Sequence, residues 1–579
     1  MFQHPFQCLK KLPKSSYLCN DILVTATGPI IFSYALDDGR VISSWPSAYF
    51  EVVAEPEIIH EATERIEGNI EPPAKKLKTS VPDNLSENSS ADIVIESPHG
   101  KRRKKRSAKG APLPLILKLA STSDGKYLVT VTSEDKCIRV FEVSPQGQLR
   151  LLSERIMPKR LFAVDVTPDD STILCADKFG DVYSLPLLVP EAGTTNLEPE
   201  GGQLAANEDK KEISPKPFVP AASTLTVHTK RNLQALQNQL KAQPKPSEKK
   251  TLDFTHELLL GHVSMLIDVI STTIPPMDDC QKSRTYILTS DRDEHIRVSR
   301  GIPQTHVIER FCFGHKEFVS KLCVPSLLPE CLISGGGDDS LFVWKWVEGL
   351  LTQKVDLRTH VECLKNSLQH DSDQDGGLET THDQLRNHEE EPIIVQLGGP
   401  GNINNSQKEK RQGTDWQGHE PSADNSEGIA VSGIWDFSLQ LIPGDDTGII
   451  LVACEGIPAI FSFLLNEQNQ LKYHQTIPVS GNILDIAVVD LNIIISVDNV
   501  YVPGSTKQFR NISADQTVLQ TFQYSSEKRI FMEGSQYSTA IDSINQEGGF
   551  EMDDSSLKAL GSVLYNIERL RKRGFEDEA

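Results

Sequence analysis

Two histidines in this chain, each preceded by glycine, have possible partners that could support proton transfer or metal binding. The first set is His262, Thr289 and Asp293, and the second set is His315, Ser334, Asp338 and Trp344. In both sets the histidine can bond the aspartate of a later turn, and a Ser or Thr can extend the network. Buried polar groups of this kind must all find hydrogen-bond partners. We therefore expect both histidines to be structural rather than catalytic or metal-ligating.

The elements that must position these residues follow a repeating pattern of four short strands. In the second set, Ser334-Gly335-Gly336-Gly337-Asp338 leads into the strand Leu341-Phe342-Val343-Trp344, which is typical of a WD-type propeller blade. Related stretches occur at 22–45, 115–143, 161–185, 261–298, 429–465 and 483–502. The sequence thus predicts an all-β fold, a WD-repeat β-propeller of seven blades. A C-terminal amphipathic helix is expected from Leu557, Leu560, Leu564, Ile567 and Leu570, stopping near Gly574.

Composition limits the classes of function. The 579 residues carry a net charge of −21 with 38% hydrophobic residues, so the surface as a whole is not a nucleic-acid footprint. The ten cysteines include no Cys-x-x-Cys pair, which argues against a zinc site and favours a reducing compartment. The start has no signal-peptide pattern, and no apolar run approaches the roughly 18 residues of a membrane helix.

Long polar segments interrupt the blades, and we expect them to be disordered insertions on loops. The resulting domain map is a first blade region 1–53, a basic and acidic insertion 54–110, blades 111–186, a polar insertion 187–253, two Gly-His blades 254–352, an acidic insertion 353–427, last blades 428–530, and a C-terminal tail with helix 531–579.

Two motifs resemble ligand sites but lack essential parts. Asp371 to Gly376 opens like a calcium loop, yet the twelfth position, which needs a bidentate Glu, is His382. Ile393 to Gly401 resembles a strand feeding a glycine loop, but no βαβ unit surrounds it. No catalytic triad or acid/base pair can be placed. We therefore expect no metal, no bound cofactor and no enzymatic activity in this chain.

A dense basic run lies in the first insertion. It consists of Lys101, Arg102, Arg103, Lys104, Lys105 and Arg106. Runs of this kind serve as nuclear-import signals or nucleic-acid patches, and some are only solvated charge. We interpret this run as a nuclear-import signal, with RNA contact and no role as the alternatives.

The stretch from Asp291 to Arg300 departs from the blade pattern. Ser299 and Arg300 stand where a regular blade has tryptophan and aspartate. Because side chains alternate along a strand, Ile296 and Val298 should pack inward while His295 and Arg297 face out. An ordinary solvated strand is the alternative interpretation.

Several stretches together resemble a known family. These are Ala176 to Ser184, Leu260 to Leu266, Thr289 to Ser299, Phe313 to Ser320 and Leu564 to Lys572. They are similar to the non-catalytic WD-repeat subunit of tRNA (guanine-N7-)-methyltransferase, with insertions of a fungal kind. The resemblance implies a separate catalytic subunit that uses S-adenosylmethionine to methylate a guanine in the tRNA variable loop.

The resemblance also implies site residues. Arg297 would form a salt bridge to the catalytic subunit, with weaker roles for Asp291, Arg292, Glu294 and His295. The chain would keep the catalytic subunit in its active shape and help to dock tRNA. The competing hypotheses are a generic WD scaffold of a nuclear assembly and an enzyme in its own right. Pull-down with the catalytic subunit tests the former, and methyl-donor binding by the isolated chain tests the latter.

Overall fold

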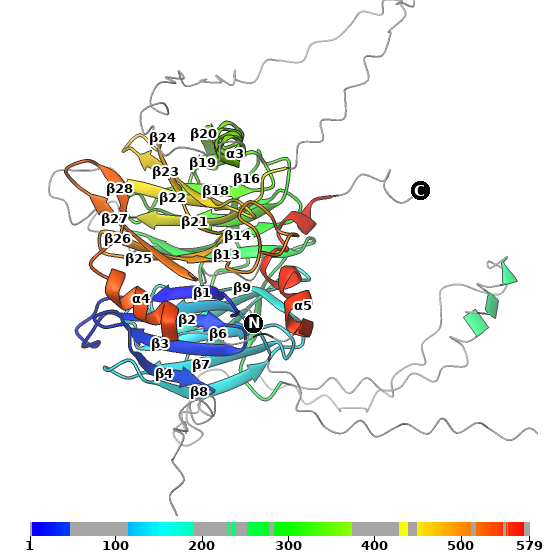
Figure 1. Ribbon diagram of the computed structural model, residues 1–579. Coiled ribbons are helices and arrows are strands. Elements are labelled where there is room, and N and C mark those ends of the chain that lie inside the picture. Colours follow the sequence, from blue (N-terminus) through cyan, green and yellow to red (C-terminus); the bar gives the residue numbers. More distant parts are fainter. Residues whose placement is uncertain are drawn as a thin grey trace, which may run out of the picture. The chain divides into compact units, whose positions relative to one another are not determined.

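Four-stranded antiparallel sheets build this chain, and the described residues of the computed structural model contain seven of them (Figure 1). They lie in the compact unit formed by residues 1–44 and 114–579, with Trp45 at its edge. The prediction of a seven-bladed propeller is confirmed. The structure describes residues 3–46, 114–189, 229–230, 233–234, 236–237, 252–276, 283–372, 428–437, 448–510, 517–547, 552 and 554–572.

Blades 1 and 2 precede the second insertion, whereas blade 3 has three strands before it and one strand after it. Blade 1 contains β1 (Phe6–Lys11), β2 (Ile22–Thr27), β3 (Ile30–Ala35) and β4 (Val41–Trp45). Blade 2 contains β5 (Ile116–Ser121), β6 (Tyr127–Thr132), β7 (Cys137–Val143) and β8 (Leu149–Ile156). Blade 3 contains β9 (Leu161–Val166), β10 (Thr172–Asp177), β11 (Asp181–Pro186) and β12 (Glu257–Gly261).

The last four blades follow in chain order. Blade 4 contains β13 (Leu266–Ile274), β14 (Arg284–Asp291), β15 (Ile296–Arg300) and β16 (Ile308–Cys312). Blade 5 contains β17 (Val319–Cys323), β18 (Cys331–Gly336), β19 (Ser340–Lys345) and β20 (Leu350–Asp356). Blade 6 contains β21 (Val431–Phe437), β22 (Gly448–Cys454), β23 (Ala459–Leu465) and β24 (Leu471–Pro478). Blade 7 contains β25 (Ile483–Val489), β26 (Asn492–Val497), β27 (Leu519–Ser525) and β28 (Ile530–Glu533).

Three predicted boundaries differ from these blades. Residues 257–261 complete blade 3 rather than opening the next blade, and blade 7 extends past residue 530 to Glu533. Residues 353–356 end β20, and residues 358–372 form a helix, so the third insertion does not begin at residue 353. The basic run 101–106 and most of the expected insertions lie outside the described residues.

Each blade is built from one continuous stretch of chain, starting with its inner strand. The first strands of neighbouring blades contact one another around the ring, and β1 against β25 closes it. At this closure the Asp485 carboxylate accepts the backbone N–H of Leu9 at 2.8 Å, and the Ser496 hydroxyl donates to the Phe6 carbonyl. Side chain to backbone bonds, rather than a shared sheet, therefore join the first and last blades.

Burial on both faces explains the apolar strands. Every residue of β22, with the sequence Gly-Ile-Ile-Leu-Val-Ala-Cys, is buried, as is every residue of β26. A sheet packed between two neighbours has no solvated face, so alternation of polar and apolar residues is lost. The same packing buries Cys137, Cys175 and Cys312, which behave as small hydrophobic residues.

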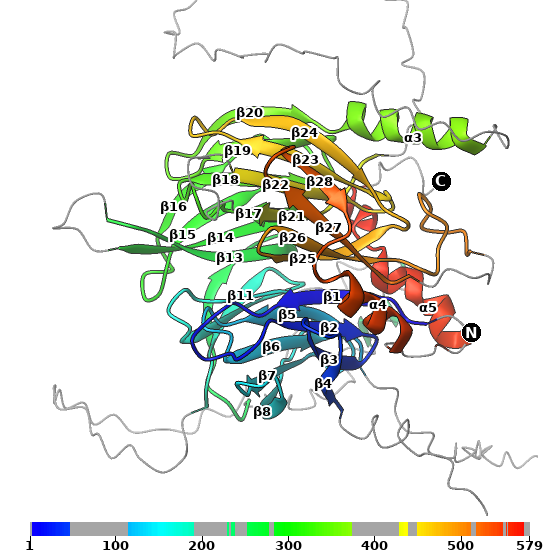
Figure 2. The same cartoon turned by 60° about the vertical axis from the view of Figure 1, so that its left-hand side comes forward.

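The labelled helices in the described part of the chain lie outside the sheets (Figure 2). The helix α3 (Arg358–Ser372) directly follows blade 5, and the Arg358 guanidinium pairs with Asp339 at its start. The helix α4 (Ser538–Glu547) lies beside blades 1 and 7 in both ribbon views. Its Asn545 side chain bonds both backbone groups of Leu519 in β27.

The expected C-terminal helix is shorter than predicted. The helix α5 (Asp554–Leu564) ends before Ile567, and a separate 3-10 turn, η1 (Glu568–Leu570), carries the last apolar position. The helix packs against Val500 and Tyr501, whereas Leu570 packs on Phe318 and Ala430. The chain turns between these two clusters because the Glu455 carboxylate accepts the backbone N–H groups of Ile567 and Glu568, at 3.0 and 2.8 Å. None of the helices in the described part could span a membrane.

Candidate partner-binding site

Blade 5 contains the complete polar network expected from its sequence. His315 bonds the Asp338 carboxylate through Nδ1 at 2.7 Å and the Ser334 hydroxyl through Nε2 at 2.8 Å. The Trp344 indole N–H donates to the same hydroxyl at 2.8 Å. Burial lowers the pKa of His315, although the neighbouring Asp338 opposes this shift. A neutral, saturated imidazole that links the strands is a structural element, not a poised base.

Blade 4 contains only part of that network. His262 Nε2 lies 3.0 Å from the Thr289 hydroxyl, as expected. The expected bond to Asp293 is absent, and the carboxylate beside His262 is that of Asp291, 3.9 Å from Nδ1. The buried Asp291 carboxylate instead accepts the backbone N–H groups of Asp293 and His295, at 2.9 and 3.0 Å. Asp291 thereby fixes the turn that connects β14 to β15.

Arg297 takes the position that Phe342 holds in blade 5, because Arg297 pairs across the sheet with Thr289 and Phe342 pairs with Ser334. The Arg297 Nε donates to the Ser299 hydroxyl at 2.9 Å, and its Nη1 donates to the Gly261 carbonyl at 3.1 Å. The residue is only 8% exposed, so the expectation that Arg297 faces outward is wrong. Neighbouring blades cover both faces of β15, and alternation along this strand therefore creates no solvated side.

The charge of Arg297 lacks an internal counter-ion. Within the described residues no carboxylate forms an ion pair with it, and its guanidinium donates to a hydroxyl and a carbonyl. Burial lowers the pKa of Arg297, and no nearby carboxylate offsets this effect. A buried cation without a partner is costly, so the site favours an incoming anion.

Arg139 in blade 2 occupies the corresponding position. It pairs across the sheet with Thr130, as Arg297 pairs with Thr289, and it too is 8% exposed. Two carboxylates neutralise it, with Nη2 2.6 Å from Asp135 and Nε 2.7 Å from Glu154. An aspartate lies four residues before each arginine, Asp135 in blade 2 and Asp293 in blade 4.

The outer strand of blade 4 presents aromatic residues where blade 2 has an acid. Glu154 pairs across the sheet with Arg139, and Phe311 holds the same place opposite Arg297. Phe311 stacks on Phe313 with ring centroids 5.4 Å apart, and the His295 ring lies 5.8 Å from Phe313. Phe313 is 64% exposed. We call these three residues, His295, Phe311 and Phe313, the aromatic edge.

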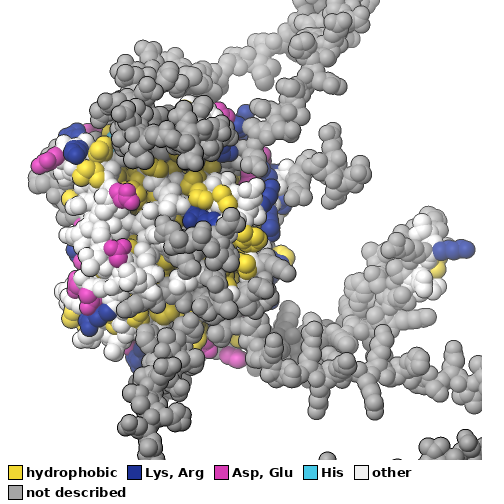
Figure 3. All heavy atoms as spheres, in the orientation of Figure 1, with side chains coloured by type: hydrophobic (Ala, Val, Ile, Leu, Met, Phe, Trp, Pro, Cys, Tyr) yellow, Lys and Arg dark blue, Asp and Glu magenta, His cyan; other side chains and the backbone are white. Residues whose placement is uncertain are grey.

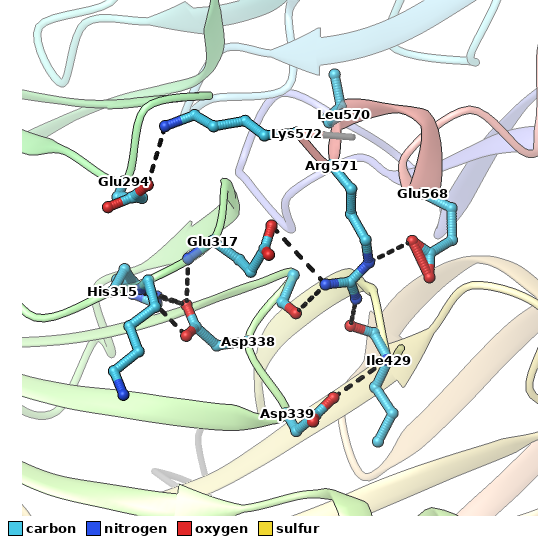
Figure 4. A network of polar contacts seen from close by, with 12 residues as sticks. Glu294, His315, Glu317, Asp338, Asp339, Ile429, Glu568, Leu570, Arg571 and Lys572 are labelled. Carbon is cyan, nitrogen blue, oxygen red and sulfur yellow. Dashed lines mark hydrogen bonds and ion pairs between the residues drawn. The ribbon is translucent and has the colours of Figure 1, made fainter. Parts of the chain in front are cut away.

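The C-terminal segment 565–572 crosses onto the loop that precedes Arg297 (Figure 4). The Lys572 ammonium lies 2.9 Å from Glu294 and 3.3 Å from Asp293. Arg292 donates from Nε to the Leu570 carbonyl at 2.8 Å. Asp293, Glu294 and Arg292 are thus occupied by the chain's own end, and of the predicted contact residues His295 is the most exposed, with 44% of its side chain accessible.

Arg571 anchors the same segment on two other blades. Its Nη1 and Nη2 donate to the carbonyls of Gly337 and Ile429, each at 2.7 Å, and its Nε pairs with Glu568 at 2.7 Å (Figure 4). At the segment's start, the Tyr565 hydroxyl bonds Asp498 of blade 7. The segment therefore connects blades 4 to 7 on one end of the ring. Sequence reasoning identified this tail only as part of a C-terminal helix and as a family resemblance, because its contacts with the blades join residues from 67 to 279 positions apart.

Among the residues described, no group of three or more His, Cys, Asp or Glu could hold a metal ion. On the side of the molecule seen in Figure 3, acidic and basic side chains are interspersed with hydrophobic and uncharged ones.

Comparison with known proteins identifies close relatives. Residues 23–522 match the family described as the tRNA methyltransferase TRM82 WD40 domain. The Aspergillus fumigatus protein named tRNA (guanine-N(7)-)-methyltransferase non-catalytic subunit trm82 is 35% identical, covering 100% of this chain and 99% of its own. The protein of the same name from Aspergillus clavatus is 36% identical, and the match covers 100% of this chain and 99% of that protein. The protein of the same name from Coccidioides immitis is 37% identical, and the match covers 95% of each chain.

Proposed function

Because the chain belongs to the TRM82 family of non-catalytic WD-repeat subunits of tRNA (guanine-N7-)-methyltransferase, we propose that it binds the catalytic subunit through blade 4. In this proposal the chain performs no chemistry and binds no cofactor. S-adenosylmethionine belongs to the catalytic subunit, which methylates N7 of a guanine in the variable loop of tRNA. The tRNA lies across the complex and not on this chain alone.

The uncompensated charge of Arg297 is the observation that carries this proposal. A carboxylate from the catalytic subunit would complete the site with a charge-assisted, often bidentate hydrogen bond. Removing one partner of such a desolvated pair costs about 2–5 kcal/mol of binding free energy. Exposed aromatic residues surround interface hot spots of this type, and the aromatic edge lies beside Arg297.

The other predicted contact residues support Arg297 in different ways. Asp291 shapes the turn, and Arg292 holds the C-terminal segment. Glu294 pairs with Lys572, while the exposed ring of His295 extends the aromatic edge. We therefore assign direct contact to Arg297 and His295, and support of the loop to the other three.

Binding at this site would act on the catalytic subunit by a population shift. A partner that binds only the active conformation raises the population of that conformation, without touching the reacting atoms. A generic scaffold of a nuclear assembly, the alternative function, would leave methylation unchanged.

Co-expression with the catalytic subunit tests the proposal. We expect N7-methylguanine formation on tRNA to require this chain and to fall with Arg297→Ala. Arg139→Ala is the matched control, because it removes an equally buried arginine whose counter-ions lie within the chain. Methylation that proceeds without this chain would contradict the proposal, and methyl-donor binding by the isolated chain would contradict its non-catalytic part.

We also propose that the chain acts in the nucleus, on the basis of the run from Lys101 to Arg106, which lies outside the described residues. Replacing the six residues with alanine should leave a fluorescent fusion in the cytoplasm. An unchanged nuclear signal would remove the import role.

A further inference from the structure

Asp135 and Asp293 occupy the same position in their blades and behave differently. Each lies four residues before the buried arginine, and each is followed by a residue with positive φ, Lys136 at 57° and Glu294 at 74°. The two turns therefore share a left-handed residue directly after the aspartate. In blade 2 this geometry brings the Asp135 carboxylate within 2.6 Å of the Arg139 guanidinium. The same turn gives Asp293 a route to Arg297.

Asp293 does not take that route. Its carboxylate lies 3.3 Å from the Lys572 ammonium, which also lies 2.9 Å from Glu294. Lys572 comes from the far end of the chain and has no counterpart at the blade 2 turn within the described residues. One cation thus holds two acidic side chains of the 291–295 loop away from the guanidinium that follows them.

Several contacts fix Lys572 at this position. Arg571, the preceding residue, is bonded to the carbonyls of Gly337 and Ile429. On the other side of the loop, Arg292 is bonded to the Leu570 carbonyl. Because blades 4, 5 and 6 all hold the segment, the ammonium group is presented to Asp293 by a fixed backbone and not by a free tail.

We propose that Lys572 is a positioning residue that keeps Asp293 off Arg297, so that the guanidinium stays available to a carboxylate of the catalytic subunit. This inference rests on the proposed function. Without Lys572, Asp293 would pair with Arg297 as Asp135 pairs with Arg139. The chain would then neutralise its own binding site.

The size of the effect follows from this competition. Apparent affinity falls by the fraction of molecules in which the site is free. If Asp293 pairs with Arg297 as strongly as the stronger of the partly exposed ion pairs, we expect the complex to weaken about sixfold. Removing the competing carboxylate should restore the affinity.

The test measures the affinity of the full chain for the purified catalytic subunit in four variants. Lys572→Met should weaken binding about sixfold. The double variant Lys572→Met/Asp293→Asn should bind within about twofold of wild type, because the competitor is gone. Asp293→Asn alone should bind at least as well as wild type. Lys528→Met on the exposed turn of blade 7 is the control for loss of a surface lysine.

Rescue separates positioning from other roles of Lys572. If the double variant stays as weak as Lys572→Met, then Lys572 contacts the partner directly or anchors the segment, and the inference is overturned. Unchanged binding of Lys572→Met overturns it as well. Since Lys572 has 53% of its side chain exposed, the variant should fold, and its melting temperature checks this.

Arg297→Ala in the same assay separates the two proposals. If Arg297→Ala weakens binding and Lys572→Met does not, only the positioning role fails. If Arg297→Ala binds normally, the proposed contact surface itself is wrong.

Discussion

Blades 2 and 4 place an arginine at the same point of the same strand and give it opposite surroundings. Burial lowers the pKa of Arg139, but its pairs with Asp135 and Glu154 outweigh this and raise the pKa above its ordinary value. The pKa of Arg297 is lowered by burial alone. The backbone of a propeller repeats from blade to blade, whereas its charge balance does not. An unbalanced charge in a regular position therefore distinguishes a blade that binds from one that only supports the ring.

Reversing the charge of the two arginines should produce the largest difference between blades 2 and 4. Arg297→Glu would set two carboxylates against each other at the interface, and we expect the affinity for the catalytic subunit to fall more than about a hundredfold. Arg139→Glu should destabilise the chain but leave the affinity of its folded fraction nearly unchanged. Titration of the two variants at a temperature well below their melting points tests this. Equal losses of affinity would show that fold damage, not contact, explains both.

A carboxylate placed in blade 4 at the position of Glu154 in blade 2 should give Arg297 a counter-ion within the chain. Phe311→Glu places an acid opposite Arg297, as Glu154 lies opposite Arg139. We expect about tenfold weaker binding with an unchanged or raised melting temperature, because the internal pair replaces the external one. Phe311→Gln, which removes the ring without adding charge, is the matched control. If both variants lose the same affinity, the aromatic ring and not the charge is the important feature.

Removing the balanced arginine should cost stability rather than binding. Arg139→Ala leaves Asp135 and Glu154 without their cation, but both acids are partly exposed. We expect the free energy of unfolding to fall by about 1–2 kcal/mol, less than for a fully buried pair. Urea unfolding measures this difference. We expect a smaller loss of stability for Arg297→Ala, and a comparable loss would contradict this expectation.

A fall in pH should have the smallest effect, and it should change the stability of the chain through His262 beside blade 4. Burial and the neighbouring Arg297 lower the pKa of His262 to about 4. The unfolded chain takes up this proton near pH 6.5 and the folded chain does not, so stability is full above pH 6.5 and is lost toward pH 4. Between pH 6.5 and 5.5 this histidine should account for about 1 kcal/mol. His262→Gln should flatten the profile by that amount, and an unchanged profile would mean that His262 has the same pKa in the folded and the unfolded chain.

Local sequence was sufficient for the fold and for one polar network. The glycine-histidine pairs and the turn aspartates are short-range signals, and they predicted the seven blades and the neighbourhood of His315, Ser334 and Trp344. The eroded blades 6 and 7 were recognisable from runs of buried β-branched residues, since a sheet packed on both sides needs them.

The candidate site depended on contacts that spacing cannot give. Alternation along β15 suggested an exposed Arg297, but burial on both faces made that inference fail. The turn spacing suggested that Asp293 bonds His262. In the structure Asp293 instead forms an ion pair with Lys572, which lies 279 positions later in the chain. Likewise, helical spacing through Leu570 could not predict the break at Tyr565, which the Glu455 carboxylate fixes from blade 6.

The continuous blades have a consequence for the order in which the protein is made. Domains form from the N-terminus as the chain leaves the ribosome, and local sheets need not wait for distant partners. All seven sheets are complete once residue 533 has emerged, whereas Arg571 and Lys572 follow only after the last blade. A chain cut between residues 533 and 571 would carry every blade and still present an unsecured 291–295 loop. With Lys572 in the proposed role, the ring forms first and its binding surface on blade 4 is completed later by a segment that belongs to no blade.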